Sequence, residues 1–332
     1  MGFLYIAGER PGAGATAIAV ALATLWRRAG NRVAIVKPVA SSEHDCDSAF
    51  FAREFGGPVE QPIVIDPDRE MIQGMAESLS PLNEENDVVI VEGQPLRLAD
   101  GYGSPALAEC LNAVVLGVIP YHRTVDESSA TDWRKTYGTS LSGVIVNRRT
   151  FYGNHDATTR LTPSFNEVGV PIHGILTEQR MLLAPTIQQV ADLLGGTFYA
   201  GASGSHELVE HFLIGGLITE WGGNYFGRLP NQAVFVRGGR TDIQMAALNT
   251  PLRGLFLTGC QTPPQYVYQR ATDLDVPLVV VKHDTASTAV LLETIDDVIT
   301  VDHPTKIDLL AGMVLEAVDL TAVASTIGLH ND

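Results

Sequence analysis

Short apolar runs that alternate with helical stretches constrain the fold of this chain more than any other feature. The runs are continuous and rich in β-branched residues, which is typical of strands buried on both faces of a parallel sheet. We predict strands at residues 3–7, 33–36, 88–91, 114–119, 143–146 and 172–176, and a helix at residues 16–29. This alternation predicts an α/β fold with a doubly wound parallel sheet.

A Gly/Ser-rich stretch at residues 201–205 interrupts the pattern, and we place a domain boundary there. Beyond it the alternation starts again. We predict strands at residues 233–236, 254–257, 277–281 and 297–301, with helices at residues 242–248 and 264–274. The chain is therefore expected to contain two domains, residues 1–200 and residues 206–325, of which the second is a smaller α/β domain.

The composition narrows the range of partners. The chain of 332 residues has a formal net charge of −16, so it repels phosphate backbones and we expect no nucleic acid partner. The first apolar run is too short for a signal peptide, and no apolar run reaches membrane-spanning length. We expect a cytoplasmic protein that does not bind a membrane.

The three cysteines are Cys46, Cys110 and Cys260, and no two of them form a CxxC pair. This spacing argues against a metal centre or a disulfide framework. We expect buried thiols in a reducing compartment.

A glycine-rich segment, GERPGAGAT at residues 8–16, follows the first strand and opens the first helix. Phosphate-binding loops occur in this context, because backbone amides and the helix N-terminus hold phosphate oxygens. A plain strand-to-helix turn also needs glycine, and on this segment alone both alternatives stay open. Thr16 could bring its hydroxyl to magnesium, but Ala15 stands where the general pattern has lysine.

The missing lysine has a direct physical cost. A charged hydrogen bond to phosphate contributes about 1.5–3 kcal/mol to binding. Removing a donor aimed at developing charge typically slows a reaction by about 10²–10³-fold. Weak nucleotide binding is compatible with this loss, whereas efficient phosphoryl transfer needs another cation. Arg10 and Lys37 are the candidates.

Further segments follow in the order and spacing of dethiobiotin synthetase and its relatives. They are KPVAS at residues 37–41, VEG at residues 91–93, and Asn147-Arg148 at the end of the fifth strand. The segment GILTEQRMLLAPT at residues 174–186 is similar to a region of cobyrinate-diamide-synthase-like proteins and of phosphate acetyltransferase N-terminal domains, with Thr177 replacing a proline. The first domain therefore resembles a P-loop NTPase-like domain of this group.

The second domain resembles the DRTGG domain. One half of its motif appears as GGRTD at residues 238–242, with Gly239 where the family usually has aspartate, and the other as LTGC at residues 257–260, with Cys260 replacing a glycine. The order of the two domains resembles the N-terminal, non-catalytic part of long phosphate acetyltransferases, a group that tolerates loss of the loop lysine. We expect no acetyltransferase domain in this protein.

The resemblance implies roles for individual residues. The implied nucleotide- or phosphate-binding residues of the first domain are Gly12, Gly14, Thr16, Lys37 and Asn147, the last reading adenine. The implied magnesium ligands are Thr16, Glu92 and either Asp47 or Asp45. In the second domain, Arg240 and Thr258 could hold a ligand phosphate, because they lie at turns and strand ends.

Each of these residues also has a plainer interpretation, which the sequence leaves open. Lys37 could be a solvated lysine, Glu92 a helix cap or salt-bridge partner, and Asn147 a simple strand end. Asp45 and Asp47 lie in a polar segment, and Asp242 could cap the helix expected to begin at Ile243. The histidines show no metal-binding spacing.

We therefore expect a regulatory or scaffolding protein that binds ATP, another nucleotide or a similar anion with Mg²⁺ and does not turn it over. The expected partners are further copies of the chain, in a closed homo-oligomer, and a separately encoded acyl-phosphate enzyme. One alternative is an active ATP-dependent ligase, like dethiobiotin synthetase or cobyrinate diamide synthase, that uses Lys37 or Arg10 in place of the missing lysine. Another is a purely structural oligomeriser. No catalytic residue is assigned.

Overall fold

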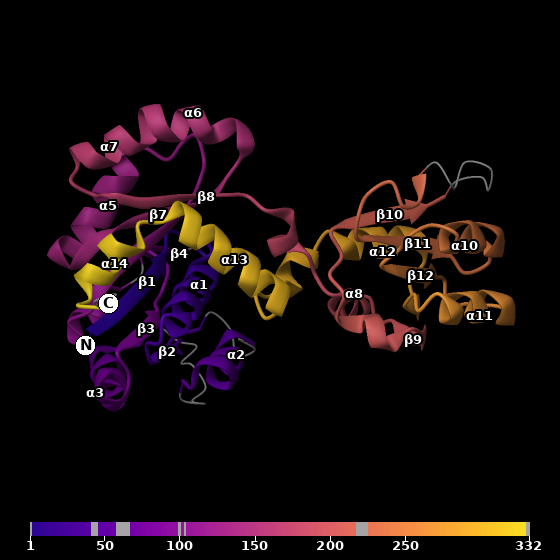
Figure 1. Cartoon of the computed structure of the whole chain (residues 1–332), viewed down its shortest axis with the longest axis horizontal. Coiled ribbons are helices and arrows are strands. Elements are labelled where there is room, and N and C mark those ends of the chain that lie inside the picture. Colours follow the sequence, from indigo (N-terminus) through magenta and orange to yellow (C-terminus); the bar gives the residue numbers. More distant parts are fainter. Residues whose placement is uncertain are drawn as a thin grey trace. The chain divides into compact units, whose positions relative to one another are not determined.

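The chain forms two compact units, as the computed structural model in Figure 1 shows. The structure describes residues 2–40, 46–57, 67–98, 101–102, 104–216 and 225–329. Unit 1 comprises Met1–Glu178 and Val301–Asp332, and unit 2 comprises Gln179–Thr300.

A six-stranded parallel sheet lies at the centre of unit 1, in the order β2-β3-β1-β6-β7-β8. Its strands are β1 (Gly2–Gly8), β2 (Val33–Val36), β3 (Val88–Glu92), β6 (Val114–Pro120), β7 (Leu141–Arg149) and β8 (Ile172–Thr177). All of the strands predicted for this domain are present, and the doubly wound sheet is confirmed. Since β1 has strands of later sequence on both sides, loops that follow neighbouring strands meet at its carboxyl end.

Helices cover the sheet of unit 1, and a small hairpin follows β3 (Figure 1). The hairpin strands are β4 (Arg97–Leu98) and β5 (Gly101–Tyr102). The helices are α1 (Ala15–Arg28), α2 (Cys46–Phe55), α3 (Arg69–Glu85), α4 (Ala106–Cys110), α5 (Glu127–Tyr137), α6 (Asn154–Asp156), α7 (Thr162–Glu167), α13 (Pro304–Ala317) and α14 (Leu320–Thr326). Helix α13 packs against α1 through a buried face that includes Leu310 and Val314. The chain therefore returns to unit 1 near its C-terminus, whereas the sequence prediction assigned residues 206–325 to the second domain.

Unit 2 contains a second sheet, in the order β10-β11-β12-β13-β9, in which only the pairing of β13 with β9 is antiparallel among the described strands. The strands are β9 (Thr197–Ala200), β10 (His211–Gly215), β11 (Gln232–Arg237), β12 (Gly254–Thr258) and β13 (Leu278–Val280). Its helices include α8 (Ile187–Leu193), α10 (Thr241–Leu248), α11 (Gln265–Asp273) and α12 (Thr285–Leu292). The smaller α/β unit is thus confirmed.

Two expectations for this region differ from the structure. The predicted strand at residues 297–301 is wrong, because Ile295–Val298 forms a 3-10 turn. Gln189 on α8 donates hydrogen bonds to the Val298 carbonyl (2.8 Å) and the Thr300 hydroxyl (3.2 Å), so side-chain contacts replace a strand ladder. The Gly/Ser stretch expected at the boundary lies inside unit 2, in a 3-10 turn at Ala202–His206 that follows β9.

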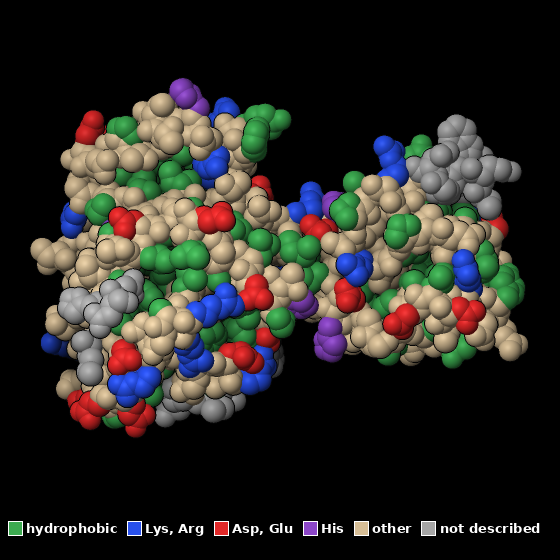
Figure 2. Space-filling view, in the orientation of Figure 1, with side chains coloured by type: hydrophobic (Ala, Val, Ile, Leu, Met, Phe, Trp, Pro, Cys, Tyr) green, Lys and Arg blue, Asp and Glu red, His purple; other side chains and the backbone are tan. Residues whose placement is uncertain are grey.

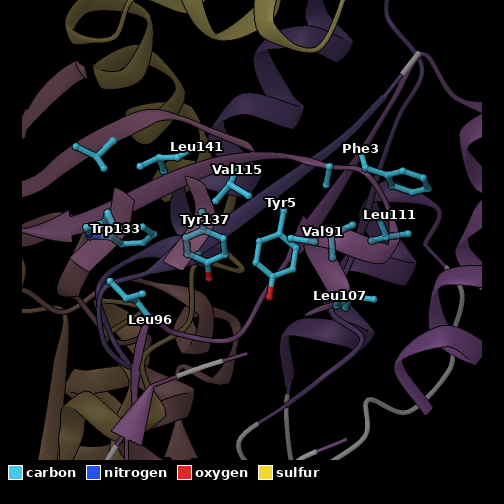
Figure 3. Close-up of a cluster of buried hydrophobic side chains, with 14 of the residues drawn as sticks. Phe3, Tyr5, Val91, Leu96, Leu107, Leu111, Val115, Trp133, Tyr137 and Leu141 are labelled. Carbon is cyan, nitrogen blue, oxygen red and sulfur yellow. The ribbon is translucent and has the colours of Figure 1, made fainter. Parts of the chain in front are cut away.

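A cluster of buried apolar side chains fills one face of the unit 1 sheet, and aromatic rings lie at its centre (Figure 3). The rings of Trp133 and Tyr137 on α5 stack with centroids 5.7 Å apart, and the rings of Tyr5 and Tyr137 lie 6.3 Å apart. Burial raises the pKa of Tyr5 to about 12, and its hydroxyl oxygen accepts a hydrogen bond from the Gln94 amide (3.1 Å). This core therefore extends to the turn that follows β3.

Candidate functional site

The glycine loop joins β1 to α1, and its glycines have conformational reasons to be there. Gly12 and Gly14 have φ values of +73° and +99°, in the left-handed region that favours glycine. A Cβ atom at Gly14 would also lie 2.3 Å from the Asn147 side-chain nitrogen. Gly14 is the N-cap of α1 and has no side chain to cap the helix amides. The loop thus leaves backbone donors and the positive end of a helix dipole at the carboxyl edge of the sheet.

Four polar side chains from four different elements meet beside this loop. Thr16 lies in the first turn of α1, Lys37 follows β2, Asp47 lies in the first turn of α2 and Glu92 ends β3. The Lys37 ammonium lies 2.7 Å from Asp47 Oδ2 and 3.3 Å from Glu92 Oε1. The Thr16 hydroxyl donates to Glu92 Oε1 at 2.9 Å and contacts Asp47 Oδ2 at 3.3 Å. The structure therefore brings together four of the residues predicted from sequence, while Asp45 lies outside the described residues.

Glu92 is the most deeply buried member of this group, with 8% of its side chain exposed. Burial raises the pKa of Glu92 to about 7; Lys37 opposes the shift, Asp47 adds to it, and the Thr16 hydroxyl opposes it. Within the described part of the chain, Glu92 Oε2 is buried and has no hydrogen-bond partner. The plain interpretation of Glu92 as a salt-bridge partner is thus realised, whereas that of Lys37 as a solvated lysine is wrong, because its side chain is only 13% exposed. One oxygen of the Glu92 carboxylate retains free acceptor capacity.

The oxygen atoms of this group fit magnesium. Mg²⁺ prefers carboxylate, hydroxyl and water oxygens, and it is usually held by one or two carboxylates. Thr16, Asp47 and Glu92 supply one hydroxyl and two carboxylates, and Glu92 Oε2 is an orphaned acceptor that a metal could use. No group of three or more His, Cys, Asp or Glu that could hold a metal occurs in the described residues, so this oxygen set rests on two carboxylates.

Asn147 fastens the glycine loop to the end of β7. Its side-chain nitrogen donates to the Ala13 carbonyl (3.0 Å), and its side-chain oxygen accepts from the Arg148 amide (2.9 Å). Arg148 itself has φ +56°, a conformation that is strained for a residue with a side chain. Both ends of the Asn147 amide are therefore engaged within the protein, and its expected role in reading adenine stays a prediction.

Glu9 is a buried carboxylate of the glycine loop for which no role was expected from sequence. It lies in the glycine loop and is only 7% exposed. Burial raises the pKa of Glu9, while nearby Arg97 and Arg10 and a hydrogen bond with Ser129 lower it. Its burial could be anticipated only from its position directly after Gly8. The side chains of a loop follow no periodic pattern from which their burial could be predicted. Glu9 adds a third carboxylate to the surroundings of the loop.

The DRTGG-like segment of unit 2 is occupied by contacts within the protein. Arg240 forms an ion pair with Asp242 (2.8 Å), and the fully buried Thr258 hydroxyl lies 2.7 Å from that of Thr285. Helix α10 begins at Thr241 with Arg240 as its N-cap, so the idea that Asp242 caps a helix beginning at Ile243 is wrong. The phosphate-binding roles of Arg240 and Thr258 stay predictions.

The cysteines are exposed, so the expectation of buried thiols is wrong for Cys46, Cys110 and Cys260 alike. Cys260 lies in the turn after β12 with φ +56°, next to Gly259 with φ +88°. It thus adopts the left-handed conformation that glycine takes most readily, at the motif position where the family usually has glycine.

Comparison with known proteins identifies relatives of both units. Residues 189–295 match the DRTGG domain, and this range lies within unit 2. Over 95% of its length the chain is 24% identical to a phosphate acetyltransferase of Deinococcus radiodurans and 26% identical to one of Pseudomonas putida. It spans about 50% of each of these relatives. The expected resemblance to phosphate acetyltransferases with a DRTGG domain is confirmed.

Among solved structures, the cell division protein MinD of Aquifex aeolicus is similar over 55% of this chain and 84% of its own, with 15% identity and a TM-score of 0.39.

Across the described residues, no helix is both long enough and apolar enough to cross a membrane.

Proposed function

We propose that this relative of the phosphate acetyltransferases is a regulatory or scaffolding protein that binds a nucleotide or similar anion, with Mg²⁺, at the glycine loop and does not turn it over. The observation that carries the proposal is a site with an assembled group of polar residues and a missing charge. Thr16, Lys37, Asp47 and Glu92 meet at the loop, while Ala15 stands where a phosphate-binding loop has lysine.

Two features support the binding of an anion: the backbone of the glycine loop, and the side chains that would hold magnesium. The uncapped start of α1 offers amide donors and a partial positive charge to an anion. Magnesium held by Thr16, Asp47 and Glu92 would supply positive charge that offsets the two carboxylates and the net charge of −16. We therefore expect anions to bind more weakly without magnesium.

The feature that argues against turnover is the lack of a loop cation. Loss of one donor aimed at developing negative charge typically costs about 10²–10³ in rate. Lys37 is one candidate replacement, but it cannot act as a loop cation while its ammonium is paired with two carboxylates. We infer that this protein retains phosphate binding but has lost efficient phosphoryl transfer.

The regulatory part of the proposal follows from the relatives. Proteins named phosphate acetyltransferase match this chain over half of their length. We propose that the chain acts in the cytoplasm on a separately encoded enzyme that handles an acyl phosphate, and that purified protein has no phosphate acetyltransferase activity.

The first test restores the missing charge. Ala15→Lys should tighten ATP binding about ten-fold or more, because a charged hydrogen bond to phosphate is worth about 1.5–3 kcal/mol. Calorimetry with ATP and with GTP, each with and without Mg²⁺, measures the change. Ala17→Lys is the matched control, because it adds the same charge to α1 two residues further on. Equal effects of the two substitutions, or no effect of either, would contradict the proposal.

An ATP-dependent ligase is the second candidate, and the retained group of Thr16, Lys37, Asp47 and Glu92 favours it. The two candidates differ in turnover. We expect negligible ATP hydrolysis; turnover on the order of 1 s⁻¹ that Thr16→Ala abolishes would replace the regulatory proposal with the ligase.

A further inference from the structure

The ammonium of Lys37 lies against the same oxygen atoms that would hold a metal ion. Lys37 and Thr16 both contact Asp47 Oδ2 and Glu92 Oε1, at distances from 2.7 to 3.3 Å. Lys37 therefore serves as the counter-ion of two carboxylates that are 25% and 8% exposed in their side chains. Without a cation between them, two carboxylates so close together and so buried would be costly.

A divalent ion and the Lys37 ammonium cannot both use these oxygens. Mg²⁺ requires oxygen ligands at about 2.0–2.1 Å in near-ideal geometry. An ammonium in hydrogen-bond contact with the same two oxygens would face the metal at close range, and like charges at that distance repel strongly. Glu92 Oε2 is buried and has no hydrogen-bond partner, so the same carboxylate also offers a metal ion an oxygen that Lys37 does not use. A metal ion there would still share both carboxylates with the ammonium, so charge repulsion favours the departure of Lys37 when the metal binds.

The Lys37 ammonium could move from the carboxylates to the glycine loop. It follows β2 directly, at the carboxyl edge where the glycine loop also ends, and lysine carries its charge on a flexible stem of four carbons. The loop lacks a cation because residue 15 is alanine. With both carboxylates ionised, the group of Lys37, Asp47 and Glu92 changes from a net charge of −1 to +1 when a divalent ion joins it.

We propose that Lys37 is an exchangeable internal cation: a divalent metal that takes Asp47 and Glu92 releases the Lys37 ammonium, which then binds the phosphate of an anion in place of the lysine absent at position 15. This inference rests on the proposed function, because it concerns the same site. Its consequence is that metal and polyphosphate bind cooperatively, with Lys37 as the coupling residue.

If Lys37 exchanges in this way, replacing it should change the affinities for metal and for polyphosphate in opposite directions. Lys37→Met removes the cation that competes with metal, so Mn²⁺ alone, followed by electron paramagnetic resonance, should bind at least about ten-fold more tightly. The same variant lacks the phosphate cation, so inorganic tripolyphosphate with Mn²⁺ should bind about ten-fold more weakly or worse, as expected for a charged hydrogen bond. Lys135→Met, which removes an exposed lysine of α5, is the control and should change neither affinity.

A second variant covers the case in which Lys37→Met does not fold. Asp47→Asn keeps a one-to-one pair between Lys37 and Glu92, and it should lose Mn²⁺ binding while binding metal-free tripolyphosphate more tightly. If the wild-type protein binds neither ATP nor tripolyphosphate under any metal condition, the proposed function fails and this inference falls with it. If it binds them but Lys37→Met moves both affinities in the same direction or leaves both unchanged, only the exchange is wrong.

Discussion

At the scale of single residues, Gly93 shows how the core positions the site. A Cβ atom at this position would lie 1.9 Å from the Tyr5 ring, which is itself only 1% exposed and held by the Gln94 amide. The chain can therefore turn directly after Glu92 only because residue 93 has no side chain. The glycine of the VEG segment serves packing, and through packing it sets the place of the Glu92 carboxylate.

We expect Gly93→Ala to lower the free energy of unfolding by about 1–3 kcal/mol, the usual cost of overpacking a filled core. Chemical denaturation of purified protein measures this loss. Gly74→Ala is the matched control: Gly74 lies inside α3 with no atom near the added methyl group, so alanine should stabilise the protein by about 0.5–1 kcal/mol. Adding Tyr5→Ala to Gly93→Ala should cost less than the sum of the two single changes, and strict additivity would count against the clash.

At the scale of elements, α13 is the helix whose position in the fold differs most from the sequence prediction. It belongs to unit 1 and packs on α1, although its residues follow the whole of unit 2 in sequence. Its first turn contains Lys306, which is only 1% exposed, and burial lowers the pKa of Lys306 to about 8. A cation in the first turn of a helix also faces the positive end of the helix dipole.

This buried lysine should make stability depend on pH. The pKa of Lys306 is about 8 when folded and near 10.4 when unfolded, so the unfolded chain binds more protons between these values and stability rises with pH across that window. The contribution is fully present above about pH 10.4 and is lost as pH falls through 8. Lys306→Met should abolish this rise and raise the free energy of unfolding at pH 7 by about 1–3 kcal/mol.

Denaturation of both proteins at several pH values from 7 to about 10.5 tests the point, because all other titrating groups are shared. Parallel stability curves for the wild type and Lys306→Met would show that the buried lysine has no such linkage.

At the scale of the whole molecule, charge and assembly are the properties to consider. The net charge is −16, yet acidic and basic side chains are interspersed on the face shown in Figure 2. A chain with this charge repels its own copies at long range, and salt screens that repulsion. Any self-association must therefore depend on short-range contacts.

We expect a closed homo-oligomer, a dimer in the simplest case, with the DRTGG domain contributing to the contact. Light scattering at micromolar concentration should give at least twice the monomer mass of 35.6 kDa. Because salt screens the repulsion between copies, the assembly should be tighter at high salt than at low salt. A monomer mass at both salt concentrations would rule the oligomer out.

The sequence by itself determined the strands of unit 1, because continuous β-branched runs such as residues 88–91 are stable only when buried on both faces. It also determined that Thr16, Lys37 and Glu92 would converge, since the carboxyl ends of parallel strands share one edge of a sheet. Only the tertiary structure decided what those residues contact: Lys37 pairs with two carboxylates, Asn147 holds the Ala13 carbonyl, and Glu9 turns inward. These contacts depend on which residues from distant parts of the sequence lie next to each side chain in the folded protein. For the same reason, the antiparallel β9, the return of α13 and the exposed cysteines follow from long-range packing, which local patterns do not encode.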